Sequence, residues 1–153
     1  MGADDYRIRP VGREHSRVLA DLHGRCFAKG WSHLEFESFF ERAGVFSSIA
    51  YHKEAGAVGF VLCWVIEDQC DLLSMGVLAD SRRDGVGLML LNYALENAAL
   101  LGAKHMVLEV NVNNAAAQSL YESYGFEKFS IRKGYYSNVD GTRSDAICMR
   151  KAL

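Results

Sequence analysis

The sequence is poor in the features that mark several classes of protein. Its 153 residues include a single proline, Pro10, and no internal repeat or low-complexity tract. This favours one folded domain over residues 1–153. Charged residues interrupt every apolar run well before the ~20 residues that a membrane helix needs. No basic stretch followed by an apolar segment opens the chain, so no secretory signal is visible. We therefore expect a soluble, cytoplasmic protein that does not bind membranes.

The chain also lacks an excess of either charge. Lys and Arg together number 17 and Asp and Glu number 19, which gives a formal net charge of −2. Sequence-independent binding to nucleic acid depends on clustered Lys and Arg. We therefore expect no direct contact with nucleic acid.

The cysteines form no metal or redox motif. None of the four belongs to a C-x-x-C pair, and no second ligand pair complements His23 and Cys26. We expect no metal, and reduced thiols that pack as small apolar residues. A catalytic thiolate is the weaker alternative, because no local feature would activate one. The cysteines are Cys26, Cys63, Cys70 and Cys148.

Hydrophobic patterns predict an α/β fold. Strands are expected at 6–9, 45–52, 57–66, 70–78, 105–110, 126–136 and 146–150. Helices are expected at 32–42, 86–102 and 115–124. Ser32 and Glu35 form a capping-box pattern that opens the first of these. A further helix is expected between the first strand and Ser32, with one apolar face made of Val18, Leu19, Leu22, Cys26 and Phe27. Short connections favour antiparallel hairpins, whereas the strand–helix–strand segment at 70–110 implies one parallel pair. The sequence therefore predicts a mixed sheet, mostly antiparallel, with about four helices on both faces.

The segment from Arg82 to Gly87 is a candidate anion site. Its glycines permit positive φ or close backbone approach, and the helix that follows presents unpaired N–H groups and the positive end of its dipole. Such an arrangement suits phosphate, and the two arginines add guanidinium groups that bind phosphate oxygens. The alternative is a plain strand-to-helix turn with solvated arginines, since short glycine motifs recur by chance.

This segment and later stretches resemble the GNAT acetyltransferases, whose cofactor motif is R/Q-x-x-G-x-G/A. The chain is particularly similar to the RimI-type ribosomal-protein N-terminal acetyltransferases. The stretches that carry the resemblance lie at 26–27, 31–32, 82–87, 108–115, 120–126, 131–136 and 145–149. They span nearly the whole chain in order. Two positions depart from the family: Ala79 stands where proline is frequent, and Asn111 where arginine is frequent.

The resemblance implies a GNAT domain that uses acetyl-CoA to acetylate an amine. The backbone of Met75, Gly76 and Val77 would pair with the pantetheine arm and polarise the thioester carbonyl, while the side chains of Met75 and Val77 pack in the core. Asn114 would contact the cofactor and can also cap its helix. The full set of implied cofactor residues is Met75, Gly76, Val77, Arg82, Arg83, Asp84, Gly85, Val86, Gly87, Leu88, Asn114 and Tyr121.

Two residues are candidates for proton transfer. Glu109 interrupts an apolar strand, where a carboxylate is costly unless it is paired, hydrated or functional. The resemblance implies that it is the general base, with a pKa raised by burial. Tyr121 would be the general acid that protonates the departing thiolate. The alternatives are a glutamate that faces solvent and a tyrosine that only packs.

The acceptor is expected to be the N-terminal α-amine of a protein, for instance a ribosomal protein. The resemblance places Trp31, Glu109, Asn111, Tyr135 and Tyr136 around it, although Trp31 can equally be a core residue. Reference pKa values of ~7.7–8.0 and ~10.4 make lysine roughly 3–4 kcal/mol harder to deprotonate than an α-amine. Two alternatives stay open: acetylation of a small-molecule amine, and a non-catalytic acyl-CoA-binding module in which Glu109 and Tyr121 are dispensable.

Overall fold

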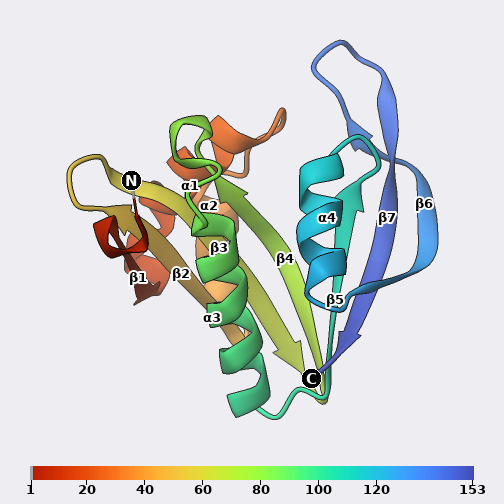
Figure 1. Cartoon of the computed structure of the whole chain (residues 1–153), viewed down its shortest axis with the longest axis horizontal. Coiled ribbons are helices and arrows are strands. Elements are labelled where there is room, and N and C mark those ends of the chain that lie inside the picture. Colours follow the sequence, from red (N-terminus) through yellow and green to blue (C-terminus); the bar gives the residue numbers. More distant parts are fainter. Residues whose placement is uncertain (1) are drawn as a thin grey trace.

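The computed structural model describes residues 2–153, which form one seven-stranded sheet with helices on both faces (Figure 1). In spatial order the strands are β1 (Tyr6–Val11), β2 (Val45–His52), β3 (Gly56–Ile66), β4 (Gln69–Val77), β5 (His105–Asn111), β7 (Arg143–Ala152) and β6 (Glu127–Ser137). The helices are α1 (Ser16–Cys26), α2 (His33–Phe40), α3 (Val86–Leu100) and α4 (Ala115–Ser123). Short 3-10 turns lie at Ala3–Asp5, Arg13–His15 and Ala79–Ser81.

The sheet has one parallel pair, as the sequence predicts. Neighbouring strands run antiparallel except β4 and β5, which α3 connects. The parallel ladder joins residues 69–72 to residues 105–108 and then stops, although β4 continues to Val77 and β5 to Asn111. Figure 1 shows the two strands diverging beyond this point. One edge of β4 therefore lies without a strand partner over residues 73–77.

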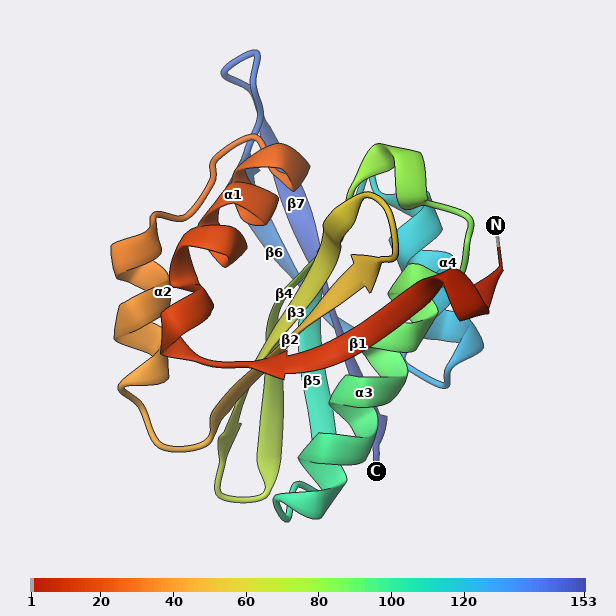
Figure 2. The ribbon, with the colours of Figure 1, turned by 90° about the vertical axis from the view of Figure 1, so that its left-hand side faces the viewer.

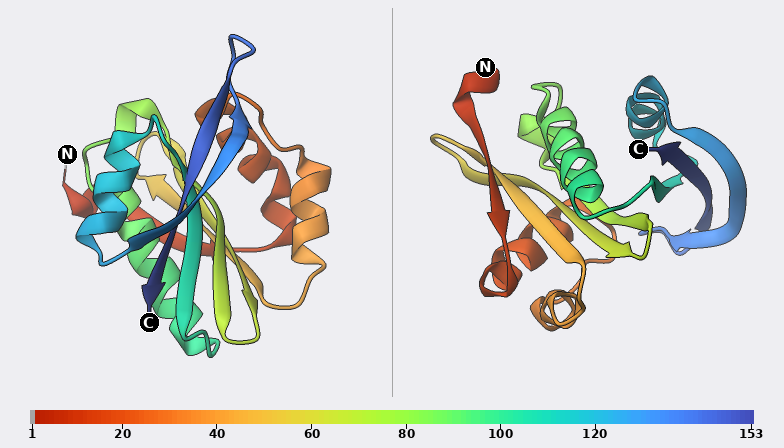
Figure 3. Two further views of the ribbon diagram at one scale, coloured as in Figure 1. Left: turned by 90° about the vertical axis from the view of Figure 1, so that its right-hand side faces the viewer. Right: turned by 90° about the horizontal axis from the view of Figure 1, so that it is seen from below.

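The helices bury two separate apolar cores. α1 and α2 cover one face of the sheet, while α3 and α4 cover the other (Figures 2 and 3). Burial along α3 follows a helical period, which explains why this segment folds as a helix against the sheet. Its buried residues are Val86, Leu90, Leu91, Ala94 and Ala98. The core under α1 and α2 is built on Leu19, Leu22, Phe36, Ile49, Phe60 and Leu62.

The predicted apolar face of α1 is wrong at two positions. Leu19 and Leu22 are buried, but Val18 and Phe27 are each 38% exposed. Val18 precedes Leu19 directly, and successive helical residues are turned about 100° apart, so the two point in different directions. Phe27 lies one residue past the end of the helix, in extended backbone.

The ends of several elements also differ from the prediction. β1 continues through Pro10, which an edge strand tolerates because β1 pairs only with β2. β7 is longer than 146–150 because it pairs on both sides, with β5 and with β6. Ser32 is confirmed as the residue that opens α2, since its Oγ accepts the Glu35 N–H at 3.2 Å. No helix described in residues 2–153 is long and apolar enough to span a membrane.

Two leucines of α3 offer a matched test of this packing. Leu90 is fully buried between the helix and the sheet, whereas Leu100 is 82% exposed. We expect Leu90→Ala to lower the free energy of unfolding by about 2–5 kcal/mol, because it leaves a cavity. Leu100→Ala, the same substitution in the same helix, should change it by less than about 0.5 kcal/mol. Urea unfolding measures both, and equal losses would contradict the packing described.

Candidate active site

The free edge of β4 lies between α1 and the start of α3. A Cβ placed on Gly76 would stand 2.9 Å from the Cys26 Sγ atom and 3.1 Å from the Phe60 ring, so only glycine fits there. The Val77 side chain lies 4.0 Å from the position of a Cβ on Gly87, in the first turn of α3. Met75 and Val77 pack against the core, as expected. The backbone of residues 73–77 has no strand partner on the side of β5.

The turn before α3 leaves the helix N-terminus uncapped. Gly85 has φ +84° and Arg83 has φ +74°. Residues other than glycine rarely adopt such a positive φ. No side chain caps α3, and its first turn contains no acidic residue. The first four N–H groups of a helix have no partner within it, which here means residues 85–88. With the positive end of the dipole, these amides suit an anionic group.

Two side chains of the turn hold its shape. Arg82 Nε donates to the Val77 carbonyl oxygen at 3.0 Å, which ties the turn to the end of β4. The Tyr6 hydroxyl donates to Asp84 Oδ2 at 2.6 Å, and this bond raises the pKa of Tyr6. The Asp84 carboxylate is thus held by β1, and the Arg83 side chain is exposed. Backbone amides therefore supply most of the anion site.

The start of α4 lies at the same end of the sheet. Asn114 Oδ1 accepts the Ala117 N–H at 3.1 Å, so Asn114 is the N-cap, as the sequence predicts. The Leu120 side chain lies 3.6 Å from the position of a Cβ on Gly87, which places α4 against the first turn of α3. Both helices thus begin where β4 and β5 have diverged, at the carboxyl ends of the parallel pair.

Glu109 lies on the opposite face of β5 from α3 and α4. Met106, Leu108 and Val110 are buried in the core, and the alternation of the strand turns Glu109 away from them. Its side chain is 29% exposed, so it is half-buried rather than enclosed. Arg132 Nη1 of β6 donates to Glu109 Oε1 at 2.7 Å. The carboxylate is therefore paired, and this pairing raises the pKa of Arg132.

Two tyrosines of β6 complete a cluster with this ion pair. The Arg132 guanidinium lies 4.6 Å from the centre of the Tyr135 ring, and the rings of Tyr135 and Tyr136 meet edge to face at 5.0 Å. Burial, followed by the nearby Glu109 carboxylate, raises the pKa of Tyr135. Burial, with the nearby Glu109 charge, also raises the pKa of Tyr136. Glu109 and both predicted acceptor tyrosines are thus brought together.

Tyr121 is buried in α4 and packs on Phe126, with ring centres 5.6 Å apart. Burial raises its pKa far above the ordinary value, which keeps the phenol protonated at neutral pH. Tyr121 also lies close enough to Tyr136 to contribute to the raised pKa of that residue. Packing and proton donation are therefore compatible at this position.

The other two predicted acceptor residues make local contacts. The Trp31 backbone N–H, between α1 and α2, donates to His23 Nδ1 at 3.0 Å, and the two rings stack at 4.4 Å. Phe36 and Phe39 also contact the indole. Asn111 Oδ1 accepts the Asn113 N–H at 2.9 Å within its own turn. Neither side chain touches the Glu109 cluster in these contacts, so their roles stay predictions.

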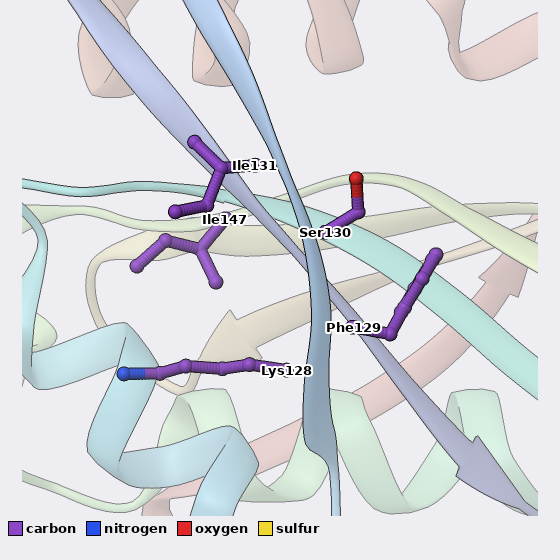
Figure 4. A pocket seen from close by; sticks show the side chains of 5 residues that line it. All are labelled: Lys128, Phe129, Ser130, Ile131 and Ile147. Atoms are coloured by element: carbon purple, nitrogen blue, oxygen red, sulfur yellow. The ribbon is translucent and has the colours of Figure 1, made fainter.

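A hollow of about 500 Å³ lies elsewhere, along β6 (Figure 4). None of the predicted site residues lines it, and β7 separates β6 from β5 in the sheet. Its lining residues are Lys128, Phe129, Ser130, Ile131 and Ile147. In residues 2–153, no group of three or more His, Cys, Asp or Glu side chains is arranged to hold a metal ion.

Comparison with known proteins identifies the family. The acetyltransferase (GNAT) family model matches residues 17–126. The chain belongs to the GNAT acetyltransferases. It is 34% identical over 128 residues to the [ribosomal protein bS18]-alanine N-acetyltransferase of Escherichia coli, covering 84% of each chain. It is 31% identical over 115 residues to N-alpha-acetyltransferase 50 of Danio rerio, covering 72% of this chain and 67% of that protein.

The fold agrees with this GNAT assignment. The crystal structure of the ribosomal-protein-S18-alanine N-acetyltransferase from Escherichia coli superposes with a TM-score of 0.87 and 29% identity, covering 97% of this chain and 94% of that one. The mixed sheet with one parallel pair is thus the GNAT fold, as the resemblance implies. The enzyme is an N-acetyltransferase, and its family uses acetyl-CoA.

Two contacts of the candidate site residues could not be predicted from the sequence: that of Arg132 with Glu109 and that of His23 with Trp31. Arg132 lies within one of the resembling stretches, but its pairing with Glu109 depends on the register of β6, β7 and β5. In the sequence, His23 stands out only as half of an incomplete metal motif. Its spacing of eight residues from Trp31 carries no signal, because an irregular connection separates them.

The buried His23 should make stability depend on pH. Burial lowers its pKa to about 4 from the ordinary value of 6.5. Between these values the unfolded chain binds a proton that the folded chain excludes, so stability is complete above pH 6.5 and falls as the pH approaches 4. We expect the free energy of unfolding to fall by about 1–3 kcal/mol over this pH range. Urea unfolding of wild type and His23→Asn measures it, since Asn keeps an acceptor for Trp31 but does not titrate. An equal pH dependence in both proteins would contradict the prediction.

Proposed function

We propose that this enzyme transfers the acetyl group of acetyl-CoA to the N-terminal α-amine of a protein, by direct transfer in a ternary complex. The observation that carries the proposal is the placement of two groups around the divergence of β4 and β5. Open backbone amides at the end of β4 and the start of α3 can bind the donor. The Glu109 cluster can take a proton, and Tyr121, in the core under α4 and close to Tyr136, can give one.

The residues present fit acetyl-CoA. The amides of residues 85–88 and the helix dipole would hold the pyrophosphate, with Arg82 and Arg83 nearby. The free edge of β4 would pair with the amide groups of the pantetheine arm, as a neighbouring strand would. Asn114 would contribute from the start of α4. Bound acetyl-CoA supplies the acetyl group as a thioester.

Three groups of the chain would then act on the reacting atoms. Backbone N–H groups at the end of β4 stabilise the negative charge on the carbonyl oxygen as the amine nitrogen bonds to the carbonyl carbon. Glu109 takes the proton that the amine loses, directly or through a water molecule. Tyr121 gives its proton to the sulfur as the carbon–sulfur bond breaks. The Arg132 guanidinium holds Glu109 beside the acceptor.

The relatives support a protein N-terminus as the acceptor. The similar bacterial enzyme is named for the alanine of ribosomal protein bS18, so a ribosomal protein of that kind is the first acceptor to test. Tyr135, Tyr136, Trp31 and Asn111 would line the path of the incoming chain. All four cysteines are free thiols, which fits a reducing compartment such as the cytoplasm.

The assignment of base and acid can be tested directly. We expect Glu109→Gln and Tyr121→Phe each to lower kcat by about 10²–10⁴-fold, because each removes a proton-transfer group. The KM for acetyl-CoA should stay close to wild type. Mass spectrometry of a peptide that begins with alanine measures turnover. Glu122→Gln and Tyr124→Phe, the same substitutions at other positions of the chain, are the matched controls.

Two results would contradict the proposal in different ways. Acetylation of polyamines or aminoglycosides, but of no peptide that begins with alanine or serine, would show a small-molecule enzyme. Full turnover by Glu109→Gln and Tyr121→Phe would show that the assigned roles are wrong while the chain still acetylates peptides.

A further inference from the structure

The strand β6 departs from regular pairing next to the Glu109 cluster. Arg132 pairs with Ala146 and Tyr136 with Ser144, so three residues of β6 face Asp145 alone on β7. These three residues are Lys133, Gly134 and Tyr135. A bulge of this kind bends the strand and redirects its side chains. It lies on the β6–β7 hairpin, which projects beyond the rest of the sheet (Figure 1).

The bulge explains how Arg132 and Tyr135 meet. In a regular strand, residues three apart point to opposite faces of the sheet. Here the Arg132 guanidinium lies 4.6 Å from the centre of the Tyr135 ring and also donates to Glu109. A β6 without the bulge would carry Tyr135 to the other face. The Glu109 cluster therefore depends on the irregular backbone at residues 133–135.

The bulge takes both backbone groups of Gly134 out of the ladder, and such groups need other partners. The Gly134 N–H donates to Asp145 Oδ1 at 2.9 Å, and its carbonyl oxygen accepts from Arg143 Nε at 2.7 Å. Each bond involves one charged side chain, which makes it stronger than a neutral bond. Gly134 has φ +60°, which places it in the left-handed region. Two side chains of β7 thus form a clamp on Gly134: Asp145 holds its N–H and Arg143 holds its carbonyl oxygen.

Asp145 also fixes the bulge relative to β5. Its backbone carbonyl accepts the Val112 N–H at 3.0 Å, directly after the strand that carries Glu109. The Gly134 amide lowers the pKa of Asp145, so its carboxylate is charged at neutral pH. Lys133 Nζ lies 3.5 Å from Asp145 Oδ2, but the Lys133 side chain is almost fully exposed. The backbone amide is therefore the main partner of this carboxylate.

We propose that Asp145 and Arg143 are positioning residues for the acceptor: by holding Gly134 they aim Tyr135 and Arg132 at Glu109. The inference rests on the proposed function, because it assigns the acceptor to the Glu109 cluster. Neither residue touches the reacting atoms. Both act through the backbone of β6, away from the open edge of β4 and the start of α3.

Asp145→Ala removes the acceptor of the Gly134 amide and is the main test. We expect kcat/KM for a peptide that begins with alanine to fall by about 10- to 100-fold, because a small displacement of the cluster misplaces the amine. The KM for acetyl-CoA should not change. Asp145→Asn keeps an oxygen acceptor and should restore most of the activity. Asp140→Asn, at the hairpin tip, is the matched control and should behave as wild type.

Amide hydrogen exchange gives a readout that does not depend on activity. We expect the Gly134 amide to exchange faster in Asp145→Ala than in wild type or Asp145→Asn, with the amides of β4 and α3 unchanged. If Asp145→Ala does not fold, Arg143→Gln tests the other half of the clamp by the same two measurements.

Three outcomes separate the proposals. Wild-type values of both kcat/KM and Gly134 exchange in Asp145→Ala would overturn the positioning role. A rise in the KM for acetyl-CoA as large as the fall in kcat/KM for the peptide would also overturn the positioning role, because it would show a general loss of structure. A wild-type enzyme that acetylates no peptide would refute the proposed function, while the exchange of Gly134 would still decide whether the clamp exists.

Discussion

The divergence of β4 and β5 is the feature on which the rest of the site depends. Their parallel ladder ends at Leu72 and Leu108, yet each strand continues for several residues. Backbone groups that would otherwise satisfy each other are left open along β4. An incoming chain with its own amides can pair there because no strand lies along this edge beyond Leu72, although the Val77 carbonyl already accepts a hydrogen bond from Arg82 Nε. Because α3 and α4 begin at the same end, the helix N-termini and the open edge face one region.

The two sides of this divergence differ in their chemistry. On the side of β4 and α3, the binding groups are backbone amides. Two hydrogen bonds hold this turn in place: Arg82 donates to the Val77 carbonyl, and Asp84 accepts from the Tyr6 hydroxyl. On the side of β5, charged and aromatic side chains gather around Glu109. Under the proposed function, the donor would meet main-chain groups, whereas the acceptor would meet side chains whose placement depends on the β6 bulge.

Much of the fold could be predicted because it is encoded locally. Periodicity located the strands and helices, the Ser32 capping box and the Asn114 cap needed only a few neighbouring residues, and the strand–helix–strand order implied the parallel pair. The contacts that organise the site are not local. Glu109 and Arg132 are 23 residues apart and meet through the register of three strands. The Asp145 clamp likewise requires a bulge that no pattern of polar and apolar residues reveals, and the folding of Arg82 onto Val77 depends on the shape of the turn.

The central claim is that the donor lies in the divergence, on the amides of β4 and α3. Amide hydrogen exchange of the full chain, with and without acetyl-CoA, tests it most directly. Added acetyl-CoA should slow the exchange of amides within residues 73–77 and 85–88 and leave the β1–β2 ladder unchanged. Protection along the β6 hollow, with no change at residues 73–77 and 85–88, would contradict the account.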